Sequence, residues 1–142
     1  MSEEQEEVTE EVTEEVTEEA AEKAGKEQRR SIRFRINTGV HVLLSSGTVV
    51  RTQGKNISIG GIYVEFEASA DVGDEFEMMF DVAFTDEIKR VFAKSKVTRS
   101  GLIGGKDVYG IAFQFLSFAK GTDVILEEYL DFREQQQGNS PL

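Results

Sequence analysis

Apolar and polar side chains alternate along most of residues 36–115, so that each short run carries one apolar face. This period of two residues is that of β-strands, and turn residues separate the runs. The six runs are defined by Val40, Val42 and Leu44; the stretch 48–53; Ile62, Val64 and Phe66; Phe76, Met78, Phe80 and Val82; Val91, Ala93 and Val97; and Tyr109, Ile111, Phe113 and Phe115. Six short strands joined by turns predict an antiparallel barrel or sandwich.

Small and polar residues place the turns between these strands. Ser45-Ser46-Gly47 predicts a turn after the first strand, and the second, from Thr48 to about Gln53, is expected to break at Gly54-Lys55-Asn56. A longer fifth strand is expected from about Lys89 to Ile103. A hairpin turn follows it at Gly104-Gly105-Lys106-Asp107.

After Gly121 the period changes to that of a helix. Thr122 or Asp123 can cap its start, and Gly138 can end it. Its apolar stripe consists of Ile125, Leu126, Tyr129, Leu130 and Phe132. We expect this stripe to pack on the open end of the barrel; the alternative is a surface offered to a partner protein or a second subunit.

The first 28 residues have a different composition, with a four-residue repeat, EEVT-EEVT-EEVT-EEA, over about residues 6–20. Glu side chains four residues apart repel one another along a helix, and Val and Thr add nothing to helix propensity. A disordered acidic tail is therefore expected, with an interaction tail or a helical oligomerisation stub as alternatives. The predicted organisation is the tail at 1–28, a barrel domain at 29–118, an amphipathic helix at 119–138 and a flexible end at 139–142.

The negative charge is confined to the tail. Of the formal net charge of −11, residues 1–28 carry −10, from twelve Glu against Lys23 and Lys26. Residues 29–142 are near neutral at −1, and they open on the strongest basic cluster, Arg29, Arg30, Arg33 and Arg35. A near-neutral body argues against a DNA- or RNA-binding protein, which would need a basic face.

Several other function classes are disfavoured by what the sequence lacks. Cysteine is absent, which removes disulfides and thiolate metal sites, and no apolar run is long enough for membrane insertion. The N-terminus does not have the pattern of a secretory signal, so a cytoplasmic location is expected. His41 has no neighbouring metal ligands, and Gly101–Lys106 lacks the spacing of a phosphate-binding P-loop. We therefore expect no catalytic residues, no metal site and no cofactor.

The barrel segment contains two motifs, and 23 positions separate Arg33, the end of the first, from Asn56, the start of the second. Arg29 to Arg33 has the pattern R-x-x-x-R just before the first strand, and Asn56 to Gly61 has the pattern N-x-S-x-x-G at a strand junction. The last strand adds Y-G-I-x-F, from Tyr109. In this order and at this spacing, the motifs resemble those of the PilZ domain family over roughly residues 28–118.

The resemblance implies a mainly all-β fold: a six-stranded antiparallel PilZ-like β-barrel with a C-terminal α-helix and the disordered acidic N-terminal tail. It implies a bacterial receptor for the second messenger cyclic di-GMP, without enzymatic activity. The ligand-binding residues that it implies are Arg29, Arg30, Arg33, Asn56, Ser58, Gly60, Gly61 and, as an extra contact, Arg99. Binding would change the conformation and signal to an unidentified downstream protein in motility, biofilm or pilus regulation. A monomer or weak homodimer is expected.

The residue types support this ligand independently of the resemblance. An arginine fork pairs with the O6 and N7 atoms of guanine or with a phosphate, and it also stacks on a base. Asn56 and Ser58 offer small hydrogen-bonding groups on one turn. Gly60 and Gly61 are expected to let the backbone approach the ligand and to adopt positive φ.

Departures from the family pattern leave an alternative open. Asn56 stands where the family more often has Asp, which removes a charged acceptor. Thr98-Arg99 stands near the family's aromatic–Arg pair, and no Trp is present to stack a base. The alternative is a PilZ-like scaffold that works by protein contacts and does not bind nucleotide. The intact R-x-x-x-R motif argues against it.

Overall fold

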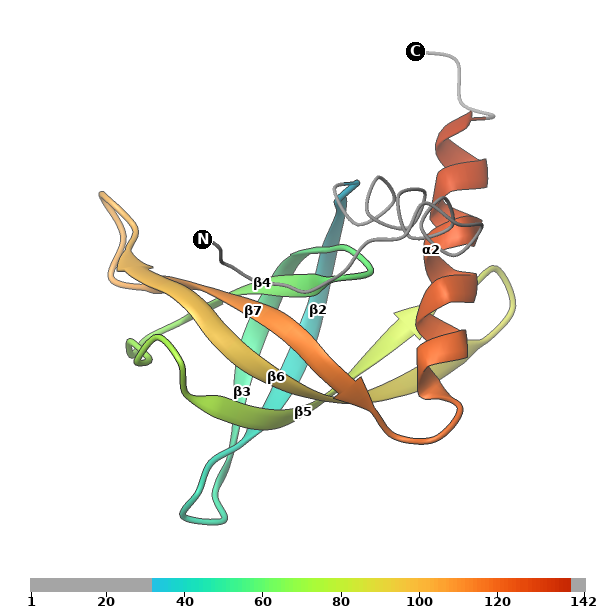
Figure 1. Ribbon diagram of the computed structural model, residues 1–142. Helices are drawn as coiled ribbons and strands as arrows, with labels where there is room; N and C mark the ends of the chain where they lie inside the picture. Colours follow the sequence, from blue (N-terminus) through green and yellow to red (C-terminus); the bar gives the residue numbers. More distant parts are fainter. Residues whose placement is uncertain (1–31, 139–142) are drawn as a thin grey trace, which may run out of the picture. The chain divides into compact units, whose positions relative to one another are not determined.

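Six strands and one helix form within residues 32–138, the part of the chain that the computed structural model describes (Figure 1). In chain order they are β2 (Phe34–Leu43), β3 (Val49–Ile57), β4 (Gly61–Phe66), β5 (Glu75–Ala83), β6 (Ile88–Leu102), β7 (Tyr109–Phe118) and α2 (Thr122–Gly138). The predictions for the tail at 1–28, the end at 139–142, and Arg29 and Arg30 lie outside the described residues.

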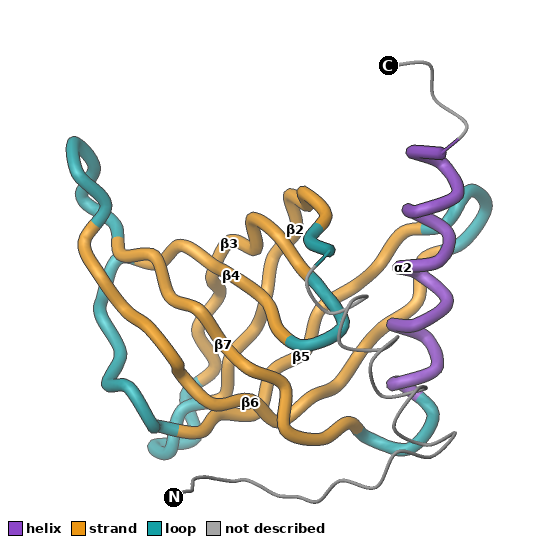
Figure 2. The backbone as a smooth tube through the Cα atoms, turned by 45° about the horizontal axis from the view of Figure 1, so that its top comes forward, coloured by secondary structure: helices purple, strands orange, loops and turns teal. Residues whose placement is uncertain are grey.

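The strands close into a barrel in the order β2-β3-β4-β7-β6-β5, and every neighbouring pair is antiparallel. β4 pairs with β7 rather than with β5, and β5 pairs with β2 to complete the barrel. Figure 2 shows the ring of strands with α2 beside it. The prediction of a six-stranded antiparallel barrel with a C-terminal helix is confirmed.

The predicted apolar faces of the strands form the core. Successive side chains of a strand point to opposite faces, so one face of each alternating run lines the interior. The most deeply buried apolar side chains of the strands include Val40, Ile57, Ile62, Val64, Phe80, Val91 and Val97. Aromatic rings add to the packing: Phe76 meets Phe113 edge-on, with 6.3 Å between their centroids.

β2 begins earlier than the alternation suggests. Phe34 is only 3% exposed, and it starts the strand because its ring belongs to the core. Arg35 consequently lies inside β2, and Arg33 lies directly before it. The basic cluster is therefore divided between a strand and the residues that precede it.

β3 runs through Gly54-Lys55-Asn56, where the sequence predicts a break. Gly54 lies in a crowded position, since a Cβ there would be 3.0 Å from a methyl group of Val40 and 3.1 Å from the oxygen of Thr38. The pairing with β4 shifts its register between Gly54 and Asn56. The glycine therefore marks a bulge and a close backbone approach, and the predicted break is wrong.

The helix α2 packs against β5 and β6 beside the hairpin that joins them (Figures 1 and 2). The residues of the predicted stripe that are buried are Leu126, Tyr129 and Leu130. Phe132 packs on Phe84, with 5.4 Å between the ring centroids. Thr122 begins the helix, and its hydroxyl donates to the main-chain oxygen of Phe92 at 3.0 Å. The first turn of α2 is thereby tied to β6.

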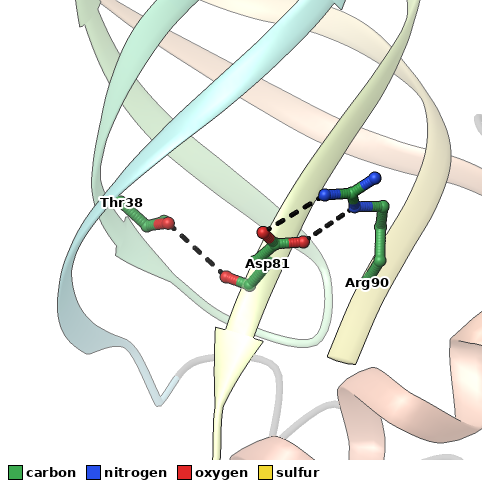
Figure 3. Close-up of polar contacts among 3 residues, drawn as sticks. All are labelled: Thr38, Asp81 and Arg90. Carbon is green, nitrogen blue, oxygen red and sulfur yellow. Dashed lines mark hydrogen bonds and ion pairs between the residues drawn. The ribbon is translucent and has the colours of Figure 1, made fainter. Parts of the chain in front are cut away.

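β2 and β5 are paired from Val40 onward and separate before it, and a cavity of about 550 Å³ opens there. At its edge the Thr38 hydroxyl donates to the main-chain oxygen of Asp81 at 3.5 Å (Figure 3). The Asp81 carboxylate forms an ion pair with Arg90 at 2.9 Å. Arg133 of α2 lines the same cavity, so the start of β2, the end of β5 and the helix meet at this point.

Candidate functional site

Arg33 lies directly before β2, with its guanidinium held by two residues of the β3–β4 junction. Its Nε donates to Asn56 Oδ1 at 2.6 Å, and its Nη1 donates to Ser58 Oγ at 3.1 Å. Residues from the two sequence motifs are thus brought into contact across 23 and 25 positions of the chain. A guanidinium fork held in one orientation loses less conformational freedom when it binds a further partner.

Ser58 is the centre of the turn between β3 and β4. It is only 1% exposed, and its Oγ accepts from the N–H of Gly60 at 3.2 Å as well as from Arg33. The same hydroxyl donates to the oxygen of Gly61 at 3.5 Å. One donor and two acceptor positions of a hydroxyl are thereby all used. Ser58 therefore supports the turn as well as the arginine.

Gly61 is required by the close approach of β7. A Cβ at this position would lie 2.1 Å from the main-chain oxygen of Phe113. Among the described residues the glycines with positive φ are Gly47, Gly73, Gly105 and Gly121. The expectation of positive φ at Gly60 and Gly61 is therefore wrong, and tight strand packing is the physical reason for Gly61.

Arg99 of β6 comes within electrostatic range of Arg33. Burial and, to a smaller extent, the like charge of Arg99 lower the pKa of Arg33 from its usual value. Within residues 32–138, no carboxylate forms an ion pair with either guanidinium. Two neighbouring cations with no acidic partner among the described residues make a place that favours an anion, such as a phosphate group.

The outer face of β4, β7 and β6 continues the site beyond Asn56. The strand register places Tyr63 between Asn56 and Ala112, and it places Ala112 opposite Arg99. The neighbouring row across the same strands consists of Gly61, Gln114 and Lys96. The sequence interpretation missed Tyr63, Gln114 and Lys96. The alternation would identify Tyr63 and Gln114 as outward-facing, but only the pairing of β4 with β7 brings them beside the arginines.

The structure places the residues that the sequence offered as possible metal or phosphate ligands. Among residues 32–138 there is no group of three or more His, Cys, Asp or Glu that could hold a metal ion. His41 is half-buried in β2, opposite Arg51 on one side and Met79 on the other. Gly105 has a positive φ of 79° in the hairpin between β6 and β7, as the predicted turn requires. No helix in the described range is long and apolar enough to span a membrane.

A family model and several solved structures match this chain. The model of the PilZ domain matches residues 27–132. The structure of the Bacillus subtilis inhibitor of motility (MotI/DgrA) is similar at 19% identity and a TM-score of 0.66, over 77% of this chain and 52% of that one. The K. pneumonia MrkH–c-di-GMP complex is 14% identical, with a TM-score of 0.61 over 75% of this chain and 52% of that one. The PilZ domain of Escherichia coli YcgR with c-di-GMP is 14% identical, with a TM-score of 0.53 over 75% of this chain and 92% of that one.

At these identities the solved structures show a shared fold. The chain spans about half the length of the inhibitor of motility and of MrkH, and nearly all of the YcgR domain. By sequence, no curated protein matches it. The family model covers the barrel and most of α2, and it begins just before the R-x-x-x-R motif. The chain therefore belongs to the PilZ domain family.

Proposed function

We propose that this PilZ protein is a receptor for cyclic di-GMP that binds the dinucleotide on the outer face of its barrel and does no chemistry on it. The observation that supports this most strongly is the guanidinium fork of Arg33, held by Asn56 and Ser58. Two of the similar solved structures, those of YcgR and MrkH, contain c-di-GMP, which supports the same ligand here.

Each site residue has a definite task in this proposal. Arg33 and Arg99 bind a phosphate or the O6 and N7 edge of a guanine, as planar guanidinium groups do elsewhere. Arg29 and Arg30, from the same motif as Arg33, supply further donors. The hydrogen-bonding residues Asn56 and Ser58 orient Arg33, and Gly60 and Gly61 leave the strand junction without side chains so that the ligand reaches the backbone.

We propose that the signal leaves through a change in the segment before β2, and that α2 transmits it to a downstream protein. Support comes from Arg133 of α2, which donates to the main-chain oxygen of Arg35, two positions after Arg33. The regulated process is motility, biofilm formation or pilus assembly; one similar solved structure is that of an inhibitor of motility. The receptor acts in the cytoplasm, as a monomer or weak homodimer, without DNA or RNA.

A PilZ-like scaffold that binds no nucleotide is the rival function. A scaffold would have no need of two neighbouring arginines without carboxylate partners among the described residues, so the cationic site weighs against it.

Isothermal titration of the full chain with cyclic di-GMP separates the two functions. Saturable binding to cyclic di-GMP, with weaker binding of GTP and of the linear dinucleotide, is the expected result. Arg51→Ala is a control for substitutions of the site arginines. Arg51 is exposed too, but it lies on β3 opposite His41, outside the site. The variant should bind as the parent does. Absence of any saturable binding in the parent would favour the scaffold.

A further inference from the structure

Tyr63 occupies a defined place on the outer face of the barrel. Its register partners are Asn56 of β3 and Ala112 of β7, and Ala112 is in turn opposite Arg99 of β6. Residues directly opposite on one face of an antiparallel pair have Cβ atoms about 4.5–5.5 Å apart. Tyr63 therefore lies in one row between Asn56, which holds Arg33, and the second arginine of the site.

The ring of Tyr63 is positioned by a glycine of β7. A Cβ on Gly110 would overlap the Tyr63 hydroxyl and would lie 2.6 Å from Cζ and 3.0 Å from Cε1. The ring thus reaches diagonally across β7 and packs on the backbone of Gly110, as aromatic side chains do where they cover a strand glycine. Tyr63 is half-buried, so the residue keeps part of its surface exposed to solvent.

The surroundings of the exposed part are suited to a flat, anionic ligand. Ala112 is the one side chain between Tyr63 and Arg99 in this row, and it is small. An open aromatic surface beside cationic groups that bind phosphate is the combination by which proteins take up bases of single-stranded nucleotides. The bases stack on the ring, and the phosphates pair with the cations.

We propose that Tyr63 is the stacking surface for one guanine of the ligand, with Gly110 positioning the ring and Ala112 leaving space for the base. This inference rests on the proposed cyclic di-GMP function. Tyr63 also covers Gly110, so the test separates this structural task from stacking.

Titration of three variants with cyclic di-GMP makes this separation. Tyr63→Leu removes the π-surface and should weaken binding about ten-fold, because base–aromatic stacking is worth about 1–3 kcal/mol per base. Tyr63→Phe keeps the ring and should bind within about two-fold of the parent. Phe92→Leu is the matched control: Phe92 is a 43% exposed aromatic residue of β6, beside the start of α2 and outside the Tyr63 row. It should leave affinity unchanged.

A measurement on the parent protein keeps the test independent of folding in the variants. In the NMR spectrum of the complex, one guanine H8 should move upfield and show a nuclear Overhauser effect to the Tyr63 ring protons. Equal affinities of the parent and Tyr63→Leu, or no such effect in the parent complex, would overturn the stacking assignment alone. Failure of the parent to bind cyclic di-GMP would overturn the proposed function instead.

Filling the space beside the ring is a second test. Ala112→Leu places a branched side chain between Tyr63 and Arg99 on a face that points away from the core. It should weaken binding at least as much as Tyr63→Leu, with a melting temperature close to that of the parent. Unchanged affinity in a folded Ala112→Leu variant would contradict a base lying at this place.

Discussion

Arg133 of α2 donates from Nη2 to the main-chain oxygen of Arg35 at 2.7 Å, across 98 positions of the chain. The same guanidinium donates from Nη1 to the Tyr129 hydroxyl at 2.6 Å and lies 5.5 Å from the centroid of the Phe34 ring. One side chain therefore links the last turns of the helix to the strand that begins directly after Arg33. A movement of Arg33 can therefore reach α2 through Phe34, Arg35 and Arg133.

Arg133→Met should uncouple the helix from the site. The variant keeps a long side chain but loses two hydrogen bonds and the cation–π contact, so stability should fall by about 1–2 kcal/mol. In hydrogen exchange, cyclic di-GMP should protect amides of α2 in the parent and not in Arg133→Met, with affinity changed by less than about three-fold. Glu134→Gln, at an exposed neighbouring position, should behave as the parent. Equal ligand-induced protection in Arg133→Met and the parent would refute this route.

Ser58→Ala should lower both stability and affinity. The sequence interpretation assigns Ser58 to the ligand alone, but its buried hydroxyl also bonds Gly60 and Gly61. Loss of these bonds leaves the partly buried N–H of Gly60 without its partner, at a cost of about 1 kcal/mol. Thermal denaturation and titration measure the two effects, with the exposed Ser117→Ala as a control. A Ser58→Ala variant as stable as the parent would show that the turn does not depend on this hydroxyl.

Gly61→Ala should destabilise the barrel strongly. The added methyl group would lie 2.1 Å from the oxygen of Phe113, so β4 and β7 must separate locally, at a cost of about 1–3 kcal/mol or more. Gly104→Ala is the matched control, because nothing lies within 4 Å of a Cβ there and no positive φ is recorded. Chemical denaturation of both variants gives the comparison. Equal unfolding free energies would mean that the β4–β7 approach is not tight.

Alternation of apolar residues was sufficient to predict six strands in an antiparallel barrel or sandwich, because a half-buried strand must place apolar residues at every second position. The resemblance to the PilZ domain selected the barrel. The structural role of a glycine could not be read from the sequence. Gly54 and Gly61 have the sequence signature of turns or of positive φ, whereas in the structure they permit close packing against neighbouring strands. Only the fold distinguishes these two uses, since the neighbour that excludes a side chain comes from a distant part of the chain.

The candidate site was partly predictable for a similar reason. The motifs identified Arg33, Asn56 and Ser58, and the structure brings these three into contact. Tyr63 and Arg133 could not be assigned from the sequence, because their places depend on the pairing of β4 with β7 and on the docking of α2. Neither relationship has a local sequence signal.

Titration of Arg33→Lys and Arg33→Ala beside the parent determines whether the oriented fork of Arg33 binds cyclic di-GMP. Lysine keeps the charge but cannot donate to Asn56 and Ser58 and also present a planar fork to the ligand. Both variants should therefore bind at least about ten-fold more weakly, as expected for a lost charge-assisted contact, while their melting temperatures stay close to that of the parent. Parent-like affinity in both variants would show that the Arg33 fork does not bind cyclic di-GMP.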